Sequence, residues 1–220
     1  MNILILGGSG FLGSSLIKRL LNYSVNVVNY DLVQLDVLNR LKSIGRLEQV
    51  TGSLDDLHKL RKYVSGADVV IHLASCTVPA ISAKNALLDI EGNLLPTVKL
   101  LEVMRSCEVK KIIYTSSGGT IYGPSSKFPI VEDSATNPIN PYGIIKLTIE
   151  KYLSYYKITH GFEPIILRVA NPYGFREGVN NNQGFVSMLF NKMMSGQSIE
   201  IWGDGDVVRD YLYIEDLVDA

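Results

Sequence analysis

The chain has 220 residues, of which 46% are hydrophobic and 20% are charged, with a net charge of −1 at pH 7. This length allows one sizeable core and a small second lobe, and the near-neutral charge argues against nucleic-acid or anionic-membrane partners. Two cysteines, Cys76 and Cys107, are too few for a disulfide framework and indicate a reduced, cytoplasmic protein. The N-terminal apolar run is too short for a signal peptide or a membrane span, and the histidines show no metal-ligand spacing.

The first stretch, MNILILGGSGFLG, predicts a strand, a glycine turn and a helix start in immediate succession. Asn2–Leu6 is a short apolar run of the kind that forms a buried strand. The glycines fit two forms: Gly8, Gly10 and Gly13 match G-x-G-x-x-G, and Gly7 with the last two matches G-x-x-G-x-x-G. Such a turn lets the backbone approach a pyrophosphate, which the free N–H groups of the helix start then bind.

A second strand and an acidic residue follow at the spacing of a dinucleotide site. Ser14–Leu21 continues the helix, Val25–Tyr30 is expected to form the strand, and Asp31 follows it. A carboxylate about 20 residues beyond the glycines is where the adenosine ribose is held. Asp31 is therefore expected to accept from the ribose of NAD and to repel the 2′-phosphate of NADP. The alternative is an ordinary polar residue at the end of a strand.

The rest of the chain alternates strand and helix, which predicts an α/β fold with a Rossmann-like, doubly wound parallel sheet. Ser53 is the expected N-cap of a helix over Leu54–Tyr63. Asn140 fits the N-cap of a helix over Pro141–His160, which has proline at its first position. The other expected elements are strands over Leu47–Thr51, Ala67–Leu73, Lys110–Ser116 and Ile165–Val169, a largely helical segment over Pro79–Ser106 and a loop over Gly118–Thr136.

The alternation loosens after Gly174, and the remainder is expected to be a small, incomplete C-terminal substrate-binding lobe. The predicted domains are residues 1–170, which bind NAD, and residues 171–220, which form this partial lobe. Ile214–Ala220 begins a helix with no stop signal, so we expect a C-terminally truncated chain. The lobe is expected to contain a helix over Phe185–Met194 and short strands over Ile199–Trp202 and Val208–Tyr213.

Tyr142 and Lys146 are the residues in which we expect the chemistry to reside. They are four positions apart on a predicted helix and therefore share one face. A free tyrosine, with a pKa near 10, is a poor base, and a neighbouring ammonium favours the phenolate. Such a tyrosine can take a proton from a substrate hydroxyl while hydride leaves the same carbon. The four-residue spacing alone is common. What favours a catalytic role is the position of the pair on the helix after the fifth strand, facing a Ser/Thr/Gly loop.

Several motifs occur in an order that resembles the extended short-chain dehydrogenase/reductase superfamily. Within it, the chain is most similar to the NAD-dependent epimerase/dehydratase family of the UDP-glucose 4-epimerase type, over essentially its whole length. The motifs are GGSGFLG, Asp31, His72-Leu73-Ala74, Asn93, Tyr114–Gly123 (YTSSGGTIYG), Tyr142-Gly143-Ile144-Ile145-Lys146, Leu167–Gly174 (LRVANPYG), Trp202–Gly205 (WGDG) and Arg209-Asp210-Tyr211.

The resemblance implies that bound NAD⁺ oxidises C4 of a nucleotide-sugar, a UDP-hexose by likeness, and that hydride returns to the other face. It makes Tyr142 the base and Lys146 its partner, with Ser117 and Thr120 bonding the reacting hydroxyl and the tyrosine. The implied substrate-binding residues are Thr120, Asn171, Trp202 and Arg209. The implied cofactor-binding residues are Gly7, Gly10, Phe11, Leu12, Gly13, Asp31, Ser53, Leu54, Leu73, Ala74, Ser75, Asn93, Ser116, Tyr142 and Lys146.

The chain departs from this pattern in the loop after the fifth expected strand. The epimerase type carries a serine where this chain has Gly118, which leaves the serine's role open among Ser116, Ser117 and Thr120. The dehydratase branch needs an Asp-Glu pair at this place. Gly118 and Gly119 stand there instead and argue against a dehydratase.

Three functions remain open from the sequence. A nucleotide-sugar 4-epimerase is favoured over a 4-keto-sugar reductase or dehydrogenase with an exchangeable cofactor, because Asp31 favours NAD and the glycine loop is epimerase-like. The third is a cofactor-binding remnant without catalysis. The resemblance also implies a homodimer formed through two long helices, about residues 80–106 and 141–160. From the net charge we expect no nucleic-acid or membrane partner.

Overall fold

The computed structural model describes residues 1–41, 45–125, 128–175, 184–201 and 203–220 of the chain. These residues form two compact units, Met1–Val169 and Ala170–Ala220, whose boundary lies one residue from the expected one. Among the described residues, no helix combines the length and the apolarity that crossing a membrane requires.

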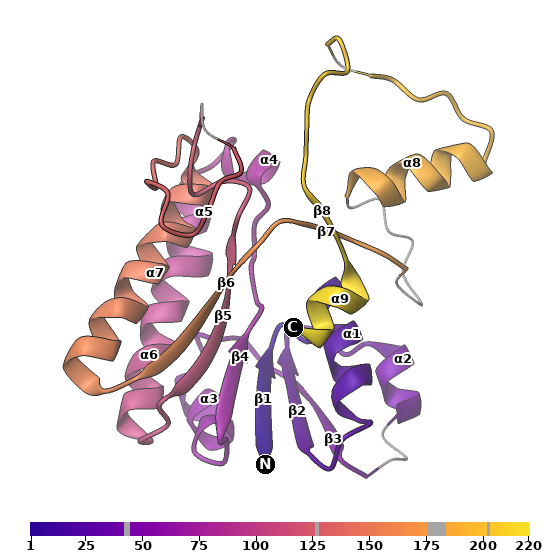
Figure 1. The fold of residues 1–220 in the computed structure, drawn as a ribbon. Coiled ribbons are helices and arrows are strands. Elements are labelled where there is room, and N and C mark those ends of the chain that lie inside the picture. The colour runs from indigo at the N-terminus through magenta and orange to yellow at the C-terminus, as the bar shows by residue number, and fades with distance from the viewer. Residues whose placement is uncertain (42–44, 126–127, 176–183, 202) are drawn as a thin grey trace. The chain divides into compact units, whose positions relative to one another are not determined.

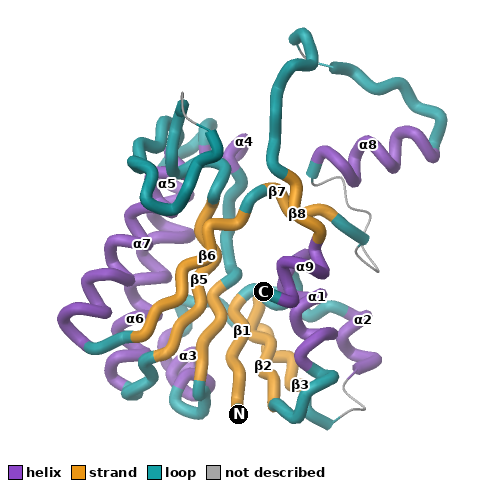
Figure 2. Tube along the Cα trace, viewed as in Figure 1, coloured by secondary structure: helices purple, strands orange, loops and turns teal. Residues whose placement is uncertain are grey.

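The first unit is built on a six-stranded sheet in the order β3-β2-β1-β4-β5-β6, and every neighbouring pair is parallel (Figures 1 and 2). β1 and β3 match the expected ranges residue for residue, and the other strands differ by one or two residues at an end. The strands are β1 (Asn2–Leu6), β2 (Asn26–Asp31), β3 (Leu47–Thr51), β4 (Val69–His72), β5 (Lys111–Ser117) and β6 (Glu163–Val169).

Helices cover both faces of this sheet, which is why its strands are apolar on both sides. Ile3 and Ile5 pack with α1 and α2 on one face, whereas Leu4 and Leu6 pack with α3, α6 and α7 on the other (Figure 1). The helices of this unit are α1 (Phe11–Leu20), α2 (Asp36–Asn39), α3 (Leu57–Val64), α4 (Pro79–Ser82), α5 (Leu87–Asp89), α6 (Leu95–Ser106) and α7 (Pro141–His160).

One predicted helix cap is confirmed and one is wrong. Asn140 caps α7 as expected, with its side chain accepting a backbone hydrogen bond. The cap of α3 is Asp56, which accepts from the backbone N–H of Lys59 at 3.0 Å, so this helix begins at Leu57. The Ser53 hydroxyl instead accepts from the backbone N–H of Asp55 at 3.1 Å, in the turn before the helix.

The segment expected to be largely helical over residues 79–106 is interrupted. Between α5 and α6 lies η2 (Ile90–Leu94), a π-helical turn. Pro96 lacks the N–H group that a regular helix would direct to the carbonyl of Gly92, which favours the wider turn. A Cβ on Gly92 would overlap the Cys76 sulfur, so the Cys76 side chain packs directly on the main chain of this turn.

The second unit contains a short parallel pair of strands and two helices. β7 (Asn171–Tyr173) pairs with β8 (Tyr211–Tyr213), and the helices are α8 (Phe185–Met194) and α9 (Ile214–Asp219). Both helices are expected from the sequence. The expected strand over Val208–Tyr213 is present in its last three residues as β8, whereas residues 199–201 form no strand, and β8 pairs with a segment remote in sequence.

Candidate functional site

A cavity of about 470 Å³ lies in the first unit, where β1, β2, β3 and β4 end. Parallel sheets bind ligands at this edge, near the point where the strand order reverses. Its wall includes these predicted cofactor residues: Gly7, Gly10, Asp31, Ser53, Leu54, Leu73, Ala74, Ser75 and Asn93. It also includes residues that the sequence analysis did not single out as cofactor-binding: Ser9, Tyr30, Leu32, Val33, Gly52, Asp55, His72, Cys76, Gly92 and Pro96.

The glycine turn after β1 decides between the two glycine forms. Gly7 has φ +83°, and a Cβ there would lie 2.7 Å from the backbone of Ala74. Gly7 and Gly10 line the cavity, whereas a Cβ on Gly13 would lie 2.4 Å from the Cα of Gly8. Gly13 thus packs α1 against the turn, and the structure favours the G-x-x-G-x-x-G form.

The N-terminus of α1 presents main-chain groups without a side-chain cap. Gly10 occupies the N-cap position and offers no side chain to the first-turn N–H groups. Phe11 and Leu12 open the helix, so their predicted contribution is through the backbone. Uncapped N–H groups and the helix dipole favour an anion, such as a pyrophosphate.

Asp31 ends β2 and lies on the cavity wall as predicted. One oxygen of its carboxylate accepts from the backbone N–H of Ser9 at 2.8 Å, and the other from that of Val33 at 3.5 Å. The carboxylate therefore ties the glycine turn to the end of β2. Because a carboxylate has about four acceptor positions, it retains capacity for a ribose hydroxyl.

A buried aspartate that the sequence analysis missed fixes the loop after β4. The carboxylate of Asp89 is fully buried and accepts from the hydroxyls of Thr77 and Ser82. Asn93 donates to Asp89 at 3.2 Å, and its side-chain oxygen accepts from the backbone N–H of Cys76 at 2.9 Å. Asn93 thus shapes the cavity wall by holding the loop. A lone aspartate in an expected helix carries no sequence signal of such burial.

His72 ends β4 beneath the cavity and is 2% exposed. Its Nε2 lies 2.9 Å from the Thr97 hydroxyl, and its Nδ1 has no partner among the described residues. Burial, assisted by the charge on Lys146, lowers the pKa of His72 to about 3. The imidazole is therefore neutral at physiological pH and part of the structural floor of the cavity.

Tyr142 and Lys146 lie one turn apart on α7, as their spacing predicts. The Lys146 Nζ is 5.6 Å from the centre of the Tyr142 ring and donates to the carbonyl of Thr115 at 2.8 Å. Lys146 is only 5% exposed. Ser75, which belongs to the cavity wall, lies close enough to Tyr142 to lower the pKa of its phenol. Lys146 is therefore buried and Tyr142 partly buried, and the pair lies near Ser75 of the cavity wall.

The protonation of this pair departs from the expectation in one respect. Burial raises the pKa of Tyr142 above its ordinary value of 10.0, the charge on Asp89 adds to the rise, and the nearby Ser75 side chain opposes it. Burial lowers the pKa of Lys146 to about 8, against the charge on Asp89. In the protein alone the pKa of Tyr142 is therefore raised by burial and by Asp89, opposite to the direction expected from a neighbouring ammonium.

The loop after β5 contains the hydroxyl residues whose roles the sequence left open. Thr120 has a buried hydroxyl with no hydrogen-bond partner among the described residues. A Cβ on Gly143 would lie 2.6 Å from the Thr120 carbonyl, so this loop packs on α7 next to Tyr142. Ser117 ends β5. The Ser116 hydroxyl donates to Glu150 and is buried, so the structure does not support its predicted cofactor role.

The comparisons with known proteins agree with this geometry. A profile of the NAD dependent epimerase/dehydratase family matches residues 3–220. The chain belongs to this family. The predicted family and its NAD cofactor are thereby confirmed.

Relatives within the epimerase/dehydratase family differ in reaction. The chain is 31% identical to a UDP-glucose 4-epimerase of Mycolicibacterium smegmatis, over 100% of this chain and 72% of the relative. It is 34% identical to a dTDP-4-dehydro-6-deoxyglucose reductase of Escherichia coli, over 99% and 70% of the two chains. The crystal structure of UDP-glucose 4-epimerase from Thermotoga maritima with UDP-glucose has a TM-score of 0.91 and 34% identity, and the match covers 100% of this chain and 71% of that one. The predicted Rossmann-like fold is confirmed.

The residues at the cavity fit the family's NAD. The wall combines a side-chain-free turn, an uncapped helix N-terminus and an acceptor at the end of β2. These are the groups that a pyrophosphate and a ribose require. Among the residues that the structure describes, no group of three or more His, Cys, Asp or Glu side chains is placed to hold a metal ion.

The second unit brings two predicted substrate motifs together. β7 begins at Asn171, whose side chain donates to the carbonyl of Asp210 at 2.8 Å. Arg209 is exposed, and its guanidinium donates to the carbonyl of Val208 at 2.9 Å. Asn171 and Arg209 are thus near neighbours within this unit. Trp202, the third predicted substrate residue outside the catalytic loop, lies outside the described residues.

Proposed function

We propose that the chain is a nucleotide-sugar 4-epimerase that acts on a UDP-hexose. The observation that carries the proposal is the Tyr142–Lys146 pair, in which Lys146 is buried and Tyr142 is partly buried, packed beside a loop whose Thr120 hydroxyl has no partner among the described residues. The glycine turn and Asp31 add a site suited to NAD rather than NADP.

In this proposal Tyr142 accepts the proton of the substrate's C4 hydroxyl. Lys146, held by the Thr115 carbonyl, stabilises the phenolate, and the Thr120 hydroxyl donates to the reacting oxygen. Bound NAD⁺ supplies the acceptor and later the donor of the C4 hydride. The raised pKa of Tyr142 suits a group that must return the same proton to the product.

Substrate binding falls to the second unit in this proposal, with residues 1–170 holding NAD and 171–220 the sugar nucleotide. The guanidinium of Arg209 suits a diphosphate by charge and by fork geometry. Asn171 offers an amide close to it. Trp202 is proposed to wall the base pocket, as the sequence predicts.

A reductase of 4-keto nucleotide-sugars is the second candidate function. It is favoured by the 34% identity to the dTDP-4-dehydro-6-deoxyglucose reductase of Escherichia coli. The same Tyr142 and Lys146 would then deliver a proton to a ketone. The two functions differ in whether the cofactor stays bound between turnovers.

The test begins with protein purified without added cofactor. Denaturation should release NAD⁺ in one-to-one ratio with the chain, identified by chromatography and mass. The intact protein should then convert UDP-glucose to UDP-galactose without added cofactor. Nucleotide-free protein that turns over only a 4-keto sugar with added NADH would favour the reductase. Protein that binds NAD but converts no UDP-hexose would contradict the epimerase proposal.

A homodimer is the assembly that we propose. The outward face of α7 carries apolar or aromatic side chains that are 39–83% exposed: Ile144, Tyr152, Tyr155 and Ile158. Leu95 at the start of α6 is also exposed. Pairing two such faces would bury them, and sedimentation at micromolar concentration should show twice the chain mass of 24.3 kDa.

A further inference from the structure

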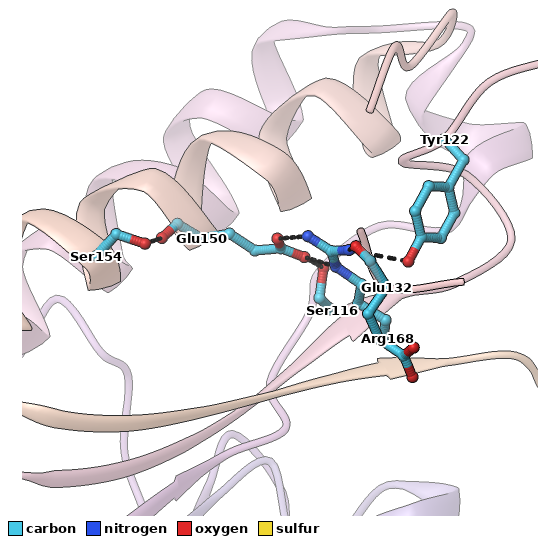
Figure 3. A network of polar contacts seen from close by, with 6 residues as sticks. All are labelled: Ser116, Tyr122, Glu132, Glu150, Ser154 and Arg168. Atoms are coloured by element: carbon cyan, nitrogen blue, oxygen red, sulfur yellow. Dashed lines mark hydrogen bonds and ion pairs between the residues drawn. The ribbon is translucent and has the colours of Figure 1, made fainter. Parts of the chain in front are cut away.

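The face of α7 that carries Tyr142 and Lys146 continues to Glu150, one turn further on. Glu150 is 5% exposed and forms a two-pronged ion pair with Arg168 of β6 (Figure 3). The Arg168 Nη2 lies 2.9 Å from Glu150 Oε2, and its Nε lies 3.3 Å from Oε1. The Ser116 hydroxyl of β5 donates to the same carboxylate. The pair therefore joins α7 to two strands of the sheet.

The other end of the Arg168 guanidinium reaches the loop after β5. Its Nη1 lies 2.8 Å from the Tyr122 hydroxyl and 2.7 Å from the carbonyl of Glu132 (Figure 3). The guanidinium also stands 5.2 Å from the centre of the Tyr122 ring. Tyr122 comes two residues after Thr120 in this loop. A single side chain thus contacts the loop at two places that are ten residues apart in sequence.

A lysine could not reproduce this arrangement. An ammonium on a flexible stem is a point charge, whereas the planar guanidinium directs donors to opposite sides at once. The Glu150 side chain is 6% exposed, so a partner lost from this pair leaves a carboxylate out of water. The geometry is therefore specific to arginine at position 168.

We propose that Arg168 is a positioning residue that, anchored by Glu150, holds the loop carrying Thr120 against the start of α7. The second contact of the same loop supports this, because Gly143 lets the Thr120 carbonyl approach the residue next to Tyr142. Arg168 sets the distance between the Thr120 hydroxyl and the Tyr142 hydroxyl without touching the substrate. The catalytic half of this inference rests on the proposed function, whereas the loop contact does not.

The test uses Tyr122→Phe, which removes only the hydroxyl that Arg168 contacts, and Arg168→Lys, which removes the fork. Tyr23→Phe, at a residue that is 58% exposed and outside the proposed site and interface, is the matched control. Amide hydrogen exchange over residues 118–125 and 128–136 is measured on each purified protein, together with NAD content. We expect faster exchange in this loop for both test variants, with NAD content unchanged and no change in the control.

Steady-state kinetics with UDP-glucose then separates positioning from stability. Because a displacement of about 1 Å can cost about 100-fold in rate, we expect kcat to fall 10- to 100-fold in Arg168→Lys and less in Tyr122→Phe. The KM for UDP-glucose should change less than about threefold, since neither residue belongs to the proposed substrate-binding set.

Two results would overturn the inference: loop exchange that matches the wild type in both variants, or faster exchange with an unchanged kcat. If the wild-type chain fails to epimerise any UDP-hexose, the proposed function fails. The exchange experiment still decides whether Arg168 holds the loop. If Arg168→Lys does not fold, Tyr122→Phe alone carries the same comparison.

Discussion

The cofactor end and the catalytic end of the candidate site are built from different kinds of chemical group. The cofactor end relies on main chain, because Gly7 and Gly10 keep side chains out of the turn and no side chain caps α1. The catalytic end relies on buried charged and polar side chains, among them Lys146, Asp89 and Glu150. The cofactor end depends on glycines that leave room for a ligand, and the catalytic end depends on charged side chains that are buried away from water. The two ends should therefore fail in different ways.

The sharpest separation is expected from Tyr142→Phe. Removing the proposed base should lower kcat for UDP-hexose epimerisation by about 1,000-fold, in the range found for general acid–base groups. NAD content should stay at the wild-type level, because the change leaves the glycine turn and Asp31 intact. Both quantities are measured on the same preparation, with Tyr23→Phe as control. Turnover that survives the change would remove Tyr142 from the mechanism.

His72 should make the fold sensitive to acid. Its pKa is about 3 when folded against about 6.5 when unfolded, so between these values the unfolded chain binds more protons and stability falls as pH drops. At pH 4.5 the free energy of unfolding is therefore lower by about 3 kcal/mol than at pH 7. His72→Gln, which can still bond to Thr97, should lose less stability from pH 7 to 4.5 in urea unfolding. Equal losses in this variant, in the wild type and in a variant of the exposed His58 would contradict the assignment.

Gly7→Ala should damage the cofactor end alone. Alanine at φ +83° is strained by about 1–2 kcal/mol, and its Cβ would also meet the backbone of Ala74. We expect at least a tenfold weaker NAD affinity by calorimetry, because about 1.4 kcal/mol corresponds to a factor of ten in an equilibrium constant. Gly66→Ala has open space around the added Cβ and is the control. Similar NAD affinities in the two variants would show that the turn does not set the cofactor site.

Asp89→Asn should give the smallest effect on activity, and this effect should be a shift of the pH profile in one direction. Its charge raises the pKa of both Tyr142 and Lys146, so removing it should move the acidic limb of the kcat/KM profile to lower pH. Thr77→Val removes a hydrogen bond to this carboxylate but leaves the charge, and its limb should stay in place. A limb that moves to higher pH in Asp89→Asn would contradict the sign of this interaction.

The sequence predicts the cofactor end better than the catalytic end for a physical reason. β1, the glycine turn, α1 and Asp31 lie within 31 residues, and local spacing determines their geometry. Tyr142 and Lys146 are also predictable from the sequence, because helical spacing places them on one face. Asp89 and Arg168 are not, since an isolated charge in a sequence normally indicates a solvated surface.

Errors in the fold have the same origin. Ser53 and Asp56 are both good caps, and only the structure shows that the Ser53 hydroxyl closes the preceding turn and that Asp56 caps α3. The pairing of β8 with β7 is non-local, so the pattern of residues 199–213 alone does not show its partner.

The most direct test of the proposed function uses UDP-glucose labelled with deuterium at C4. We predict UDP-galactose that keeps the deuterium at C4, because the hydride removed from this carbon returns to it while Tyr142 returns the proton to the oxygen. Deuterium found at C6 would indicate dehydratase chemistry. Deuterium lost from the product, or no conversion of a UDP-hexose by NAD-loaded protein, would contradict the epimerase assignment.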